Sequence, residues 1–360
     1  MNYLLLDIVD ISFSIEKSRI YLNKSIYYLS VAIKKNNSSL NGNLLDTLIS
    51  KSENNLISNT YFSWYANSLL RSISNEKVID VKGIEYAEVV FSELINENRG
   101  EENLGINYLH FESNNFKYYV PINLPEILRM KFDDWKEFES SIKYDQWEIN
   151  FSKSIELIEK INPELITCIN LLVENILVVY SQDNSHGSMS PKNIIGTVYL
   201  PDIEDFTLLA ECLIHEALHQ YLYRLEHCAS LFVENEGIKE IYYSPWKDEP
   251  RPLIMVLHGA FVFTGVILYY HQLCEKNIIP DMIEEFKIRL SKRHVQVSVA
   301  VEVLLKNNKL TGFGTQIVEI IQENLREVTQ SGFLDVSTSM NDVLDHKLKF
   351  SGKDYIHANI

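Results

Sequence analysis

A metal-binding signature lies in the second half of the chain, at Leu213-Ile214-His215-Glu216-Ala217-Leu218-His219-Gln220. It reads H-E-x-x-H inside an apolar pattern typical of a helix. Positions i and i+4 of a helix lie one above the other on the same face, so His215 and His219 can direct two imidazoles at one ion. Glu216 lies on the neighbouring row, where it can serve as a catalytic group. The stretch therefore predicts a metal-binding helix, which we expect to span residues 206–228.

The residues before this helix predict how it begins. Residues 194–201 (IIGTVYLP) have the composition of a short buried strand. Asp202, Glu204 and Asp205 then supply a candidate N-terminal cap and an acidic first turn. A strand that leads directly into a buried H-E-x-x-H helix is the local layout of zincin-like metalloenzymes, which we expect here.

Two histidines leave a metal site one protein ligand short. Leu222 and Leu225 occupy the glycine and histidine positions of the longer H-E-x-x-H-x-x-G-x-x-H motif, so the third ligand must come from elsewhere. We favour His258, which follows five apolar residues and precedes Gly259, a residue that permits close helix approach. A downstream glutamate is the alternative, and three lie within reach in sequence: Glu234, Glu236 and Glu240.

Arg251 is a candidate anchor for a carboxylate ligand. Pro250 and Pro252 flank it, so its backbone is held on a stiff, extended segment. It precedes His258 by seven residues, about 9 Å along a helix axis that starts at Pro252. A rigid guanidinium near an open metal position suits bidentate carboxylate binding. An ordinary loop ion pair with Asp248 or Glu249 is an equally good interpretation.

The pattern of apolar residues predicts a mainly α (α+β) fold. We expect helices separated by Asn/Ser-rich breaks in residues 1–100, a strand at residues 116–121, and a second buried helix that packs on the motif helix. The expected division is a helical N-terminal region at 1–160, a metal-binding catalytic region at 161–330 and a peripheral tail at 331–360. The N-terminal region carries no catalytic spacing, and peptide recognition is its expected role.

Composition excludes some classes of partner. A net charge of −16 over 360 residues disfavours nucleic acid and anionic membrane surfaces. Residues 252–274 carry no charge and could span a bilayer, but they include two histidines and two glycines, so we expect a soluble core helix. The N-terminus lacks the pattern of a signal peptide, and no two cysteines have C-x-x-C spacing. We therefore expect a cytoplasmic protein with free thiols.

The motifs together resemble one family. H-E-x-x-H at 215–219, S-P-W at 244–246, R-P at 251–252 and H-G at 258–259 are similar to the HExxH-motif peptide-modification proteins. Those proteins are encoded beside ribosomally synthesised, post-translationally modified peptides. The match covers about residues 194–265.

The resemblance implies an iron(II)/2-oxoglutarate-dependent oxygenase that hydroxylates a side chain of a precursor peptide. It implies His215, His219 and His258 as iron ligands and 2-oxoglutarate as the metal-chelating co-substrate. Glu216 would then orient a ligand or a water molecule from outside the coordination shell.

Chemistry leaves the metal open, because three imidazoles suit zinc as well as iron. In a zinc metallopeptidase Glu216 would be the general base on a metal-bound water. A third possibility is a metal-clamped peptide-binding protein without activity. In that case Glu211 or His227 is the candidate for the fourth ligand.

Overall fold

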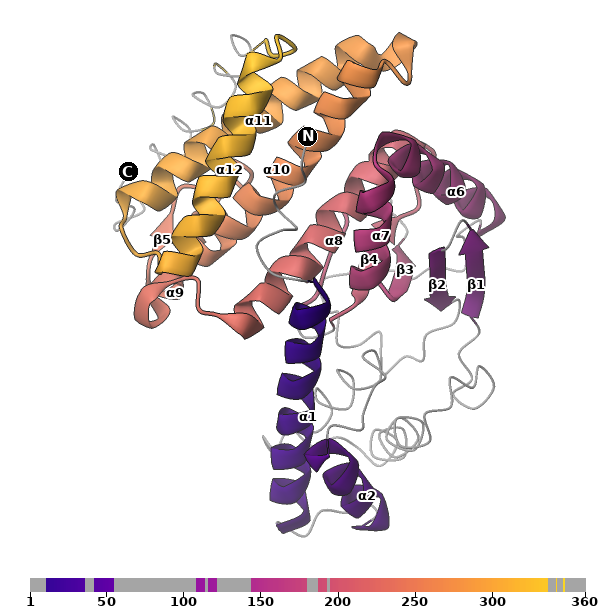
Figure 1. The fold of residues 1–360 in the computed structure, drawn as a ribbon, viewed down its shortest axis with the longest axis vertical. Helices are drawn as coiled ribbons and strands as arrows, with labels where there is room; N and C mark the ends of the chain where they lie inside the picture. The colour runs from indigo at the N-terminus through magenta and orange to yellow at the C-terminus, as the bar shows by residue number, and fades with distance from the viewer. Residues whose placement is uncertain are drawn as a thin grey trace. The chain divides into compact units, whose positions relative to one another are not determined.

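A computed structural model describes residues 11–35, 42–54, 108–113, 116–121, 144–179, 187–192, 195–335, 341 and 346. These residues are mainly α-helical, which confirms the predicted fold class (Figure 1). Two short sheets complete the described structure, one of four strands and one of two. Much of the helical region expected within residues 1–100 lies outside the described residues, apart from its first two helices.

The chain divides into two compact units. One contains Ile155–Leu165 and the chain from Ala210 onward, and the other contains Ile11–Ser154 and Ile166–Leu209. The chain passes between them more than once, so neither unit is a single continuous segment. The division expected at residues 160 and 330 stays a prediction.

The unit that contains Ile11–Ser154 and Ile166–Leu209 holds the larger sheet. Its strands lie in the order β1-β2-β3-β4, with an antiparallel first pair and parallel pairs thereafter. The strand predicted at residues 116–121 is confirmed as β2, and the one predicted at 194–201 is β4. The elements of this unit are α1 (Ile11–Lys35), α2 (Gly42–Glu53), β1 (Tyr108–Ser113), β2 (Phe116–Pro121), α7 (Pro163–Leu172), β3 (Asn175–Val179), β4 (Thr197–Pro201) and most of α6 (Tyr144–Ile161).

Strand β4 is buried along its whole length. Val198, Tyr199 and Leu200 are inaccessible to solvent. Trp147, stacked on Phe151 with 4.7 Å between ring centroids, donates its indole N–H to the carbonyl of Pro201 at 3.3 Å. This packing holds the end of the strand that leads to the metal-binding signature.

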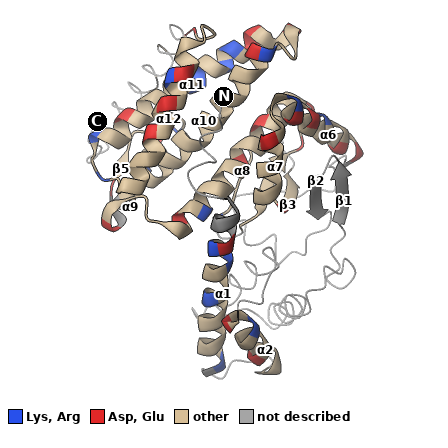
Figure 2. Ribbon diagram, in the orientation of Figure 1, with Lys and Arg blue, Asp and Glu red and all other residues tan. Residues whose placement is uncertain are grey.

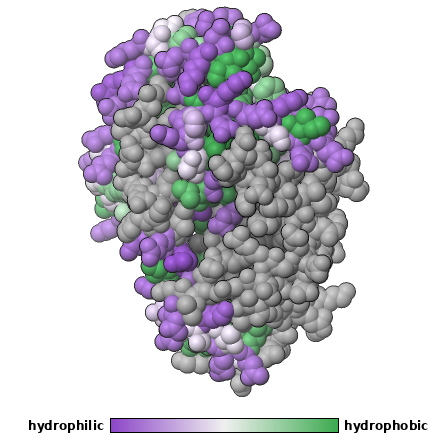
Figure 3. Space-filling view, turned by 45° about the vertical axis from the view of Figure 1, so that its right-hand side comes forward, coloured by the Kyte–Doolittle hydropathy of each residue, from purple (hydrophilic) through white to green (hydrophobic). Residues whose placement is uncertain are grey.

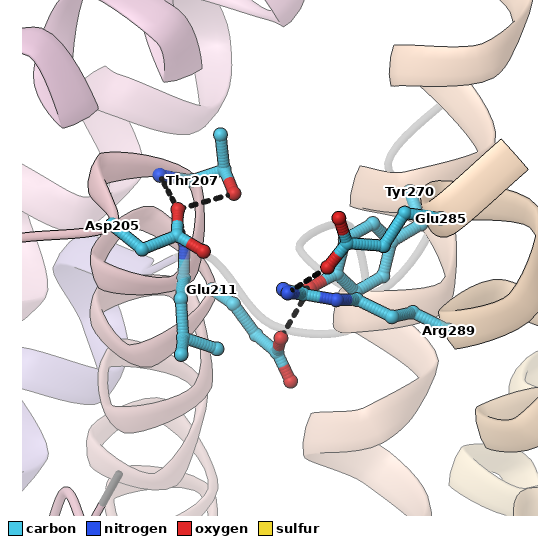
Figure 4. A network of polar contacts seen from close by, with 7 residues as sticks. Asp205, Thr207, Glu211, Tyr270, Glu285 and Arg289 are labelled. Atoms are coloured by element: carbon cyan, nitrogen blue, oxygen red, sulfur yellow. Dashed lines mark hydrogen bonds and ion pairs between the residues drawn. The ribbon is translucent and has the colours of Figure 1, made fainter. Parts of the chain in front are cut away.

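The predicted motif helix is confirmed as α8 (Phe206–Cys228). Of the acidic residues expected at its start, Asp205 is the cap: its Oδ1 accepts from the backbone N–H of Thr207 at 2.9 Å and of Leu208 at 3.1 Å (Figure 4). The hydroxyl of Thr207 donates to the same oxygen at 2.7 Å. These bonds satisfy amide groups that have no partner within the helix.

The unit that contains most of α8 is built from long helices. The second buried helix predicted from sequence is α10, which begins at Leu253; Pro252 lies just before it, in β6. Helix α10 packs on α11 and α12. The remaining elements are η2 (Val233–Asn235), α9 (Glu236–Lys239), β5 (Ile241–Tyr242), β6 (Arg251–Pro252), α10 (Leu253–Lys276), η3 (Pro280–Met282), α11 (Ile283–Lys306) and α12 (Gly312–Gln330).

Helix α10 is long and apolar enough to cross a membrane, and its charged residues, Glu275 and Lys276, lie at its end (Figure 2). However, 72% of its most apolar window is buried inside the protein. Burial of that kind is typical of the core helix of a soluble protein. On the face drawn in Figure 3, apolar residues of the described chain form separate patches among hydrophilic ones.

Candidate metal centre

Helix α8 presents a line of polar side chains along one face. His215, His219 and Glu226 are spaced four and seven residues apart, which keeps them on the same side of a 3.6-residue helix. Tyr223 lies between them. All four residues are half-buried, whereas the apolar residues on the other faces are buried in the core. The helix thus exposes to the site only the face that carries ligand-type side chains.

Helix α10 approaches α8 closely at a glycine. A Cβ atom on Gly265 would lie 2.1 Å from Cδ1 of Leu218, so a larger residue here would require the side chain of Leu218 to shift. Leu218 directly precedes His219 in the chain. The close helix approach that the sequence assigned to Gly259 is therefore made by Gly265, and it brings the side chains of the two helices into contact.

His258 of α10 meets His219 of α8. Their Nδ1 atoms lie 3.1 Å apart, and their rings are nearly parallel with centroids 5.4 Å apart. On its other side, Nε2 of His258 lies 2.6 Å from Oε1 of Glu226. A carboxylate only accepts, so the proton of a neutral His258 belongs on Nε2 and its Nδ1 lone pair is directed at His219.

His215 adds a third imidazole to this pair. Its ring lies edge-on to that of His219, with 4.9 Å between centroids, and edge-on to Phe263 of α10 at 4.8 Å. Burial, reinforced by the positive charge of Arg293, lowers the pKa of His215 to about 3. Burial and the two neighbouring imidazoles lower the pKa of His219 as well. Both rings are therefore neutral at pH 7, the state in which imidazole binds metals.

The spacing of the nitrogens tests whether a metal fits. Two nitrogens that bind one ion at ~2.1 Å lie roughly 3.0–3.4 Å apart, for angles between octahedral and tetrahedral. The separation of 3.1 Å between Nδ1 of His219 and Nδ1 of His258 falls in that range. Among the described residues, no three His, Cys, Asp or Glu side chains converge as they stand on a single point. The nitrogens of His219 and His258 thus have a separation that fits a shared ion, and the ring of His215 lies beside that of His219.

Glu216 is buried beside the first histidine. It is 2% exposed, and its Oε1 lies 4.0 Å from Nε2 of His215. Burial and the charges of Glu216 and Glu226 raise the pKa of Tyr223, so its phenol stays protonated at neutral pH. The ring of Tyr223 lies 4.9 Å from that of His258. The site thus combines the neutral imidazoles of His215 and His219 with His258, a protonated phenol and two glutamate side chains.

Arg251 lies in β6, two residues before α10 begins. Its guanidinium forms an ion pair with the exposed carboxylate of Glu249, the ordinary loop pair that the sequence also allowed. Its other polar contact is with the sulfur of Met255 at 4.0 Å. The structure therefore gathers His215, His219 and His258, while the described contacts of Arg251 lie outside this cluster.

The S-P-W and H-G motifs meet at one place. A Cβ on Gly259 would lie 2.6 Å from the ring of Trp246, so this glycine, next to His258, accommodates the indole. Trp246 stacks on Phe263 with 5.2 Å between centroids. The carbonyl of Pro245 accepts a hydrogen bond from Nε2 of Gln296 at 3.0 Å. The two motifs therefore form one wall of the histidine cluster.

The alternative glutamates have other surroundings. Glu240 bonds Lys309 at 2.9 Å and the hydroxyl of Tyr242. Glu234 is exposed on η2, where it adopts a left-handed conformation with φ of 45°. The side chain of Glu236 lies outside the described structure. These positions leave His258 as the third ligand that the described structure favours.

Glu211, a candidate ligand in the structural-clamp interpretation, belongs to a separate polar network. The hydroxyl of Tyr270 donates to it, and Arg289 donates to that hydroxyl at 3.0 Å while pairing with Glu285 (Figure 4). His227 is half-buried in the last turn of α8. The carboxylate of Glu211 therefore already has hydrogen-bond partners within this network.

Two residues of the site were missed from sequence. Glu226 was detectable, because it lies seven residues after His219 and hence on the same helix face. Arg293 carried no such signal, since it lies on α11, far from the motif in sequence. The charge of Arg293 acts on His215.

Comparison with known proteins adds no relative. No protein-family model matches the chain, and no curated protein matches it.

Proposed function

We propose that this protein is an iron(II)/2-oxoglutarate-dependent oxygenase that hydroxylates a side chain of a ribosomally made precursor peptide. The observation that carries the proposal is the meeting of three imidazoles from α8 and α10, with Glu226 behind His258. The sequence resemblance supplies the reaction class.

In this proposal His215, His219 and His258 hold the iron. The bound metal, with 2-oxoglutarate and O₂, supplies the oxidising power needed to hydroxylate an unactivated C–H bond. Overall, 2-oxoglutarate, O₂ and the peptide C–H group yield succinate, CO₂ and the hydroxylated peptide. Three protein ligands leave coordination positions open for the co-substrates.

The surrounding residues have supporting roles. Glu226 accepts a hydrogen bond from the Nε2–H group of His258. This bond keeps the Nδ1 lone pair of His258 directed at the site. Phe263 lies edge-on to His215, and Trp246 stacks on Phe263, so the two rings supply an apolar side to the site. The protonated phenol of Tyr223 can donate a hydrogen bond to a bound ligand.

The precursor peptide is the proposed partner, and the cytoplasm the proposed location. All four cysteines, Cys168, Cys212, Cys228 and Cys274, are free thiols, as expected in a reducing compartment. The acidic net charge of −16 suits a neutral or basic peptide better than nucleic acid or an anionic membrane.

The decisive experiment is anaerobic reconstitution with Fe²⁺. The protein is then exposed to O₂ with 2-oxoglutarate and the precursor peptide encoded beside its gene. We expect a peptide heavier by one oxygen atom and one succinate for each hydroxylation, measured by mass spectrometry. His258→Ala is expected to abolish both products, whereas His271→Ala, on a distant turn of α10, should retain them. A peptide cut into two fragments would contradict the proposal.

A zinc metallopeptidase is the second candidate, and the burial of Glu216 beside His215 favours it. In a peptidase Glu216 would take a proton from the attacking water. Glu216→Gln separates the two functions: it should remove nearly all hydrolysis, whereas a hydroxylase should retain measurable activity. The assay uses zinc-loaded and iron-loaded protein side by side, because zinc readily occupies iron sites.

A further inference from the structure

Arg293 of α11 presents a guanidinium at the edge of the histidine cluster. Its Cζ lies 4.2 Å from the centroid of the Phe263 ring. The same ring lies edge-on to His215, with 4.8 Å between centroids. A single aromatic ring therefore separates this cation from the first histidine of the motif.

Two groups orient the guanidinium of Arg293. Phe263 supports its flat face, and Oε1 of Gln296 accepts from its Nη1 at 3.1 Å. Gln296 is buried and is itself fixed by its bond to the carbonyl of Pro245. Solvent-exposed ion pairs alone hold a surface arginine only weakly, so these contacts give Arg293 a more defined position. The position of the cation is thus set by packing on Phe263 and by a hydrogen bond to Gln296, which the S-P-W segment fixes in turn.

The charge of Arg293 is only partly compensated. Its Nη2 lies 3.5 Å from Oε1 of Glu211, a long separation for an ion pair. That carboxylate also accepts the hydroxyl of Tyr270, so Arg293 shares it. A guanidinium has five N–H donors, and the contacts with Gln296 and Glu211 engage two of them. Among the described residues, the half-buried side chain therefore retains donors for an anionic ligand.

Arg251, the carboxylate anchor expected from sequence, has different surroundings. Its guanidinium pairs with Glu249, and its second polar contact is with the exposed Met255. Neither contact joins the histidine cluster. Arg293 lies next to Phe263, an aromatic ring that contacts the candidate ligand His215. The described contacts of Arg251 include no such ring.

We infer that Arg293 is the residue that binds the distal carboxylate of a five-carbon 2-oxo dicarboxylate held at the histidine cluster. This inference rests on the proposed function and adds the residue that selects its co-substrate. Bidentate pairing between a planar guanidinium and a carboxylate supplies both affinity and orientation. Phe263, on which Trp246 stacks, supports the guanidinium from one side.

The test measures binding rather than turnover. Equilibrium dialysis under anaerobic conditions, with Fe²⁺-loaded protein, compares 2-oxoglutarate with 2-oxopentanoate, which has a methyl group in place of the distal carboxylate. The wild-type protein should prefer 2-oxoglutarate. In Arg293→Gln we expect 2-oxoglutarate to bind roughly 10- to 100-fold more weakly, the value of a charge-assisted bond, with little change for 2-oxopentanoate. Arg293→Lys should restore part of the preference.

Controls separate this role from packing. Arg326→Gln removes a charge from the exposed face of α12 and should leave both affinities unchanged. If Arg293 only supports Phe263, its replacement will lower the affinity for both acids equally. That result overturns the inference. It is also overturned if Arg251→Gln, and not Arg293→Gln, abolishes the preference. A wild-type protein that binds both acids equally refutes the inference alone, while one that binds neither refutes the proposed co-substrate as well.

Discussion

Oε1 of Glu226 lies 2.6 Å from Nε2 of His258, across the interface between α8 and α10. On its opposite side, the same imidazole directs Nδ1 at Nδ1 of His219, 3.1 Å away. This is the arrangement by which a carboxylate fixes the tautomer and the orientation of a metal-binding histidine. It links the last part of the motif helix to the ligand on the second helix.

Glu226→Gln tests this link. The amide keeps the size of the side chain but loses the charge that holds the Nε2 proton of His258. We expect affinity for zinc, used as a stable probe ion, to fall about 10- to 100-fold, as for other carboxylates behind a ligand histidine. Competition against a coloured chelator measures the change. Glu319→Gln on exposed α12 is the matched control, and equal affinities in the two variants would show that Glu226 plays no part.

Gly265→Ala tests the close approach of α8 and α10. Its Cβ would lie 2.1 Å from Cδ1 of Leu218, which is buried and must repack. We expect a loss of about 1–3 kcal/mol in the free energy of unfolding, measured by urea titration. Gly312→Ala is the control, because nothing lies within 4 Å of the Cβ it would add. In a Leu218→Ala background the cost of Gly265→Ala should shrink, and strict additivity of the two changes would refute the clash.

His271 should make stability depend on pH. It is 5% exposed, and within the described part of the chain neither ring nitrogen has a hydrogen-bond partner. Burial lowers its pKa below 6.5, although Glu275 and Glu327 act in the opposite direction. The unfolded state then binds the proton more readily than the folded state. Stability is therefore full above the unfolded pKa of about 6.5 and declines as pH falls below it.

His271→Phe should weaken this dependence, because the phenyl ring fills the site and carries no proton. We expect the free energy of unfolding to drop less between pH 7.5 and pH 5.5 than in the wild type. Urea titrations at the two pH values measure the difference. His294, whose pKa is also lowered by burial, should supply part of the remaining slope. If the free energy of unfolding changes equally with pH in the two proteins, His271 does not contribute to the pH dependence.

Asp205→Ala tests the start of the motif helix. The change removes the acceptor for the backbone N–H groups of Thr207 and Leu208. We expect a loss of about 1 kcal/mol in the free energy of unfolding. Asp205→Asn, which keeps a capping oxygen, should recover most of it. Thermal unfolding followed by circular dichroism compares the variants, and an unchanged midpoint for Asp205→Ala would contradict the capping role.

The features predicted from sequence are those set by local spacing. His215 and His219 share a face because four residues make about one helical turn, whatever surrounds the helix. The strand before α8 and the apolar run of α10 were also detectable, because periodicity and composition act over a few residues. Even Glu226 obeys this rule, since seven residues make about two turns.

Contacts between helices required the tertiary structure. Gly265 lies against Leu218, and His258 meets His219. The packing of α11 on α10 places Arg293 beside Phe263. Such contacts depend on the distance and rotation of helices far apart in the chain, which packed side chains determine together. The sequence by itself therefore determined a helix with two histidines on one face, a candidate metal site. Only the fold decided which third imidazole, carboxylate and guanidinium surround it.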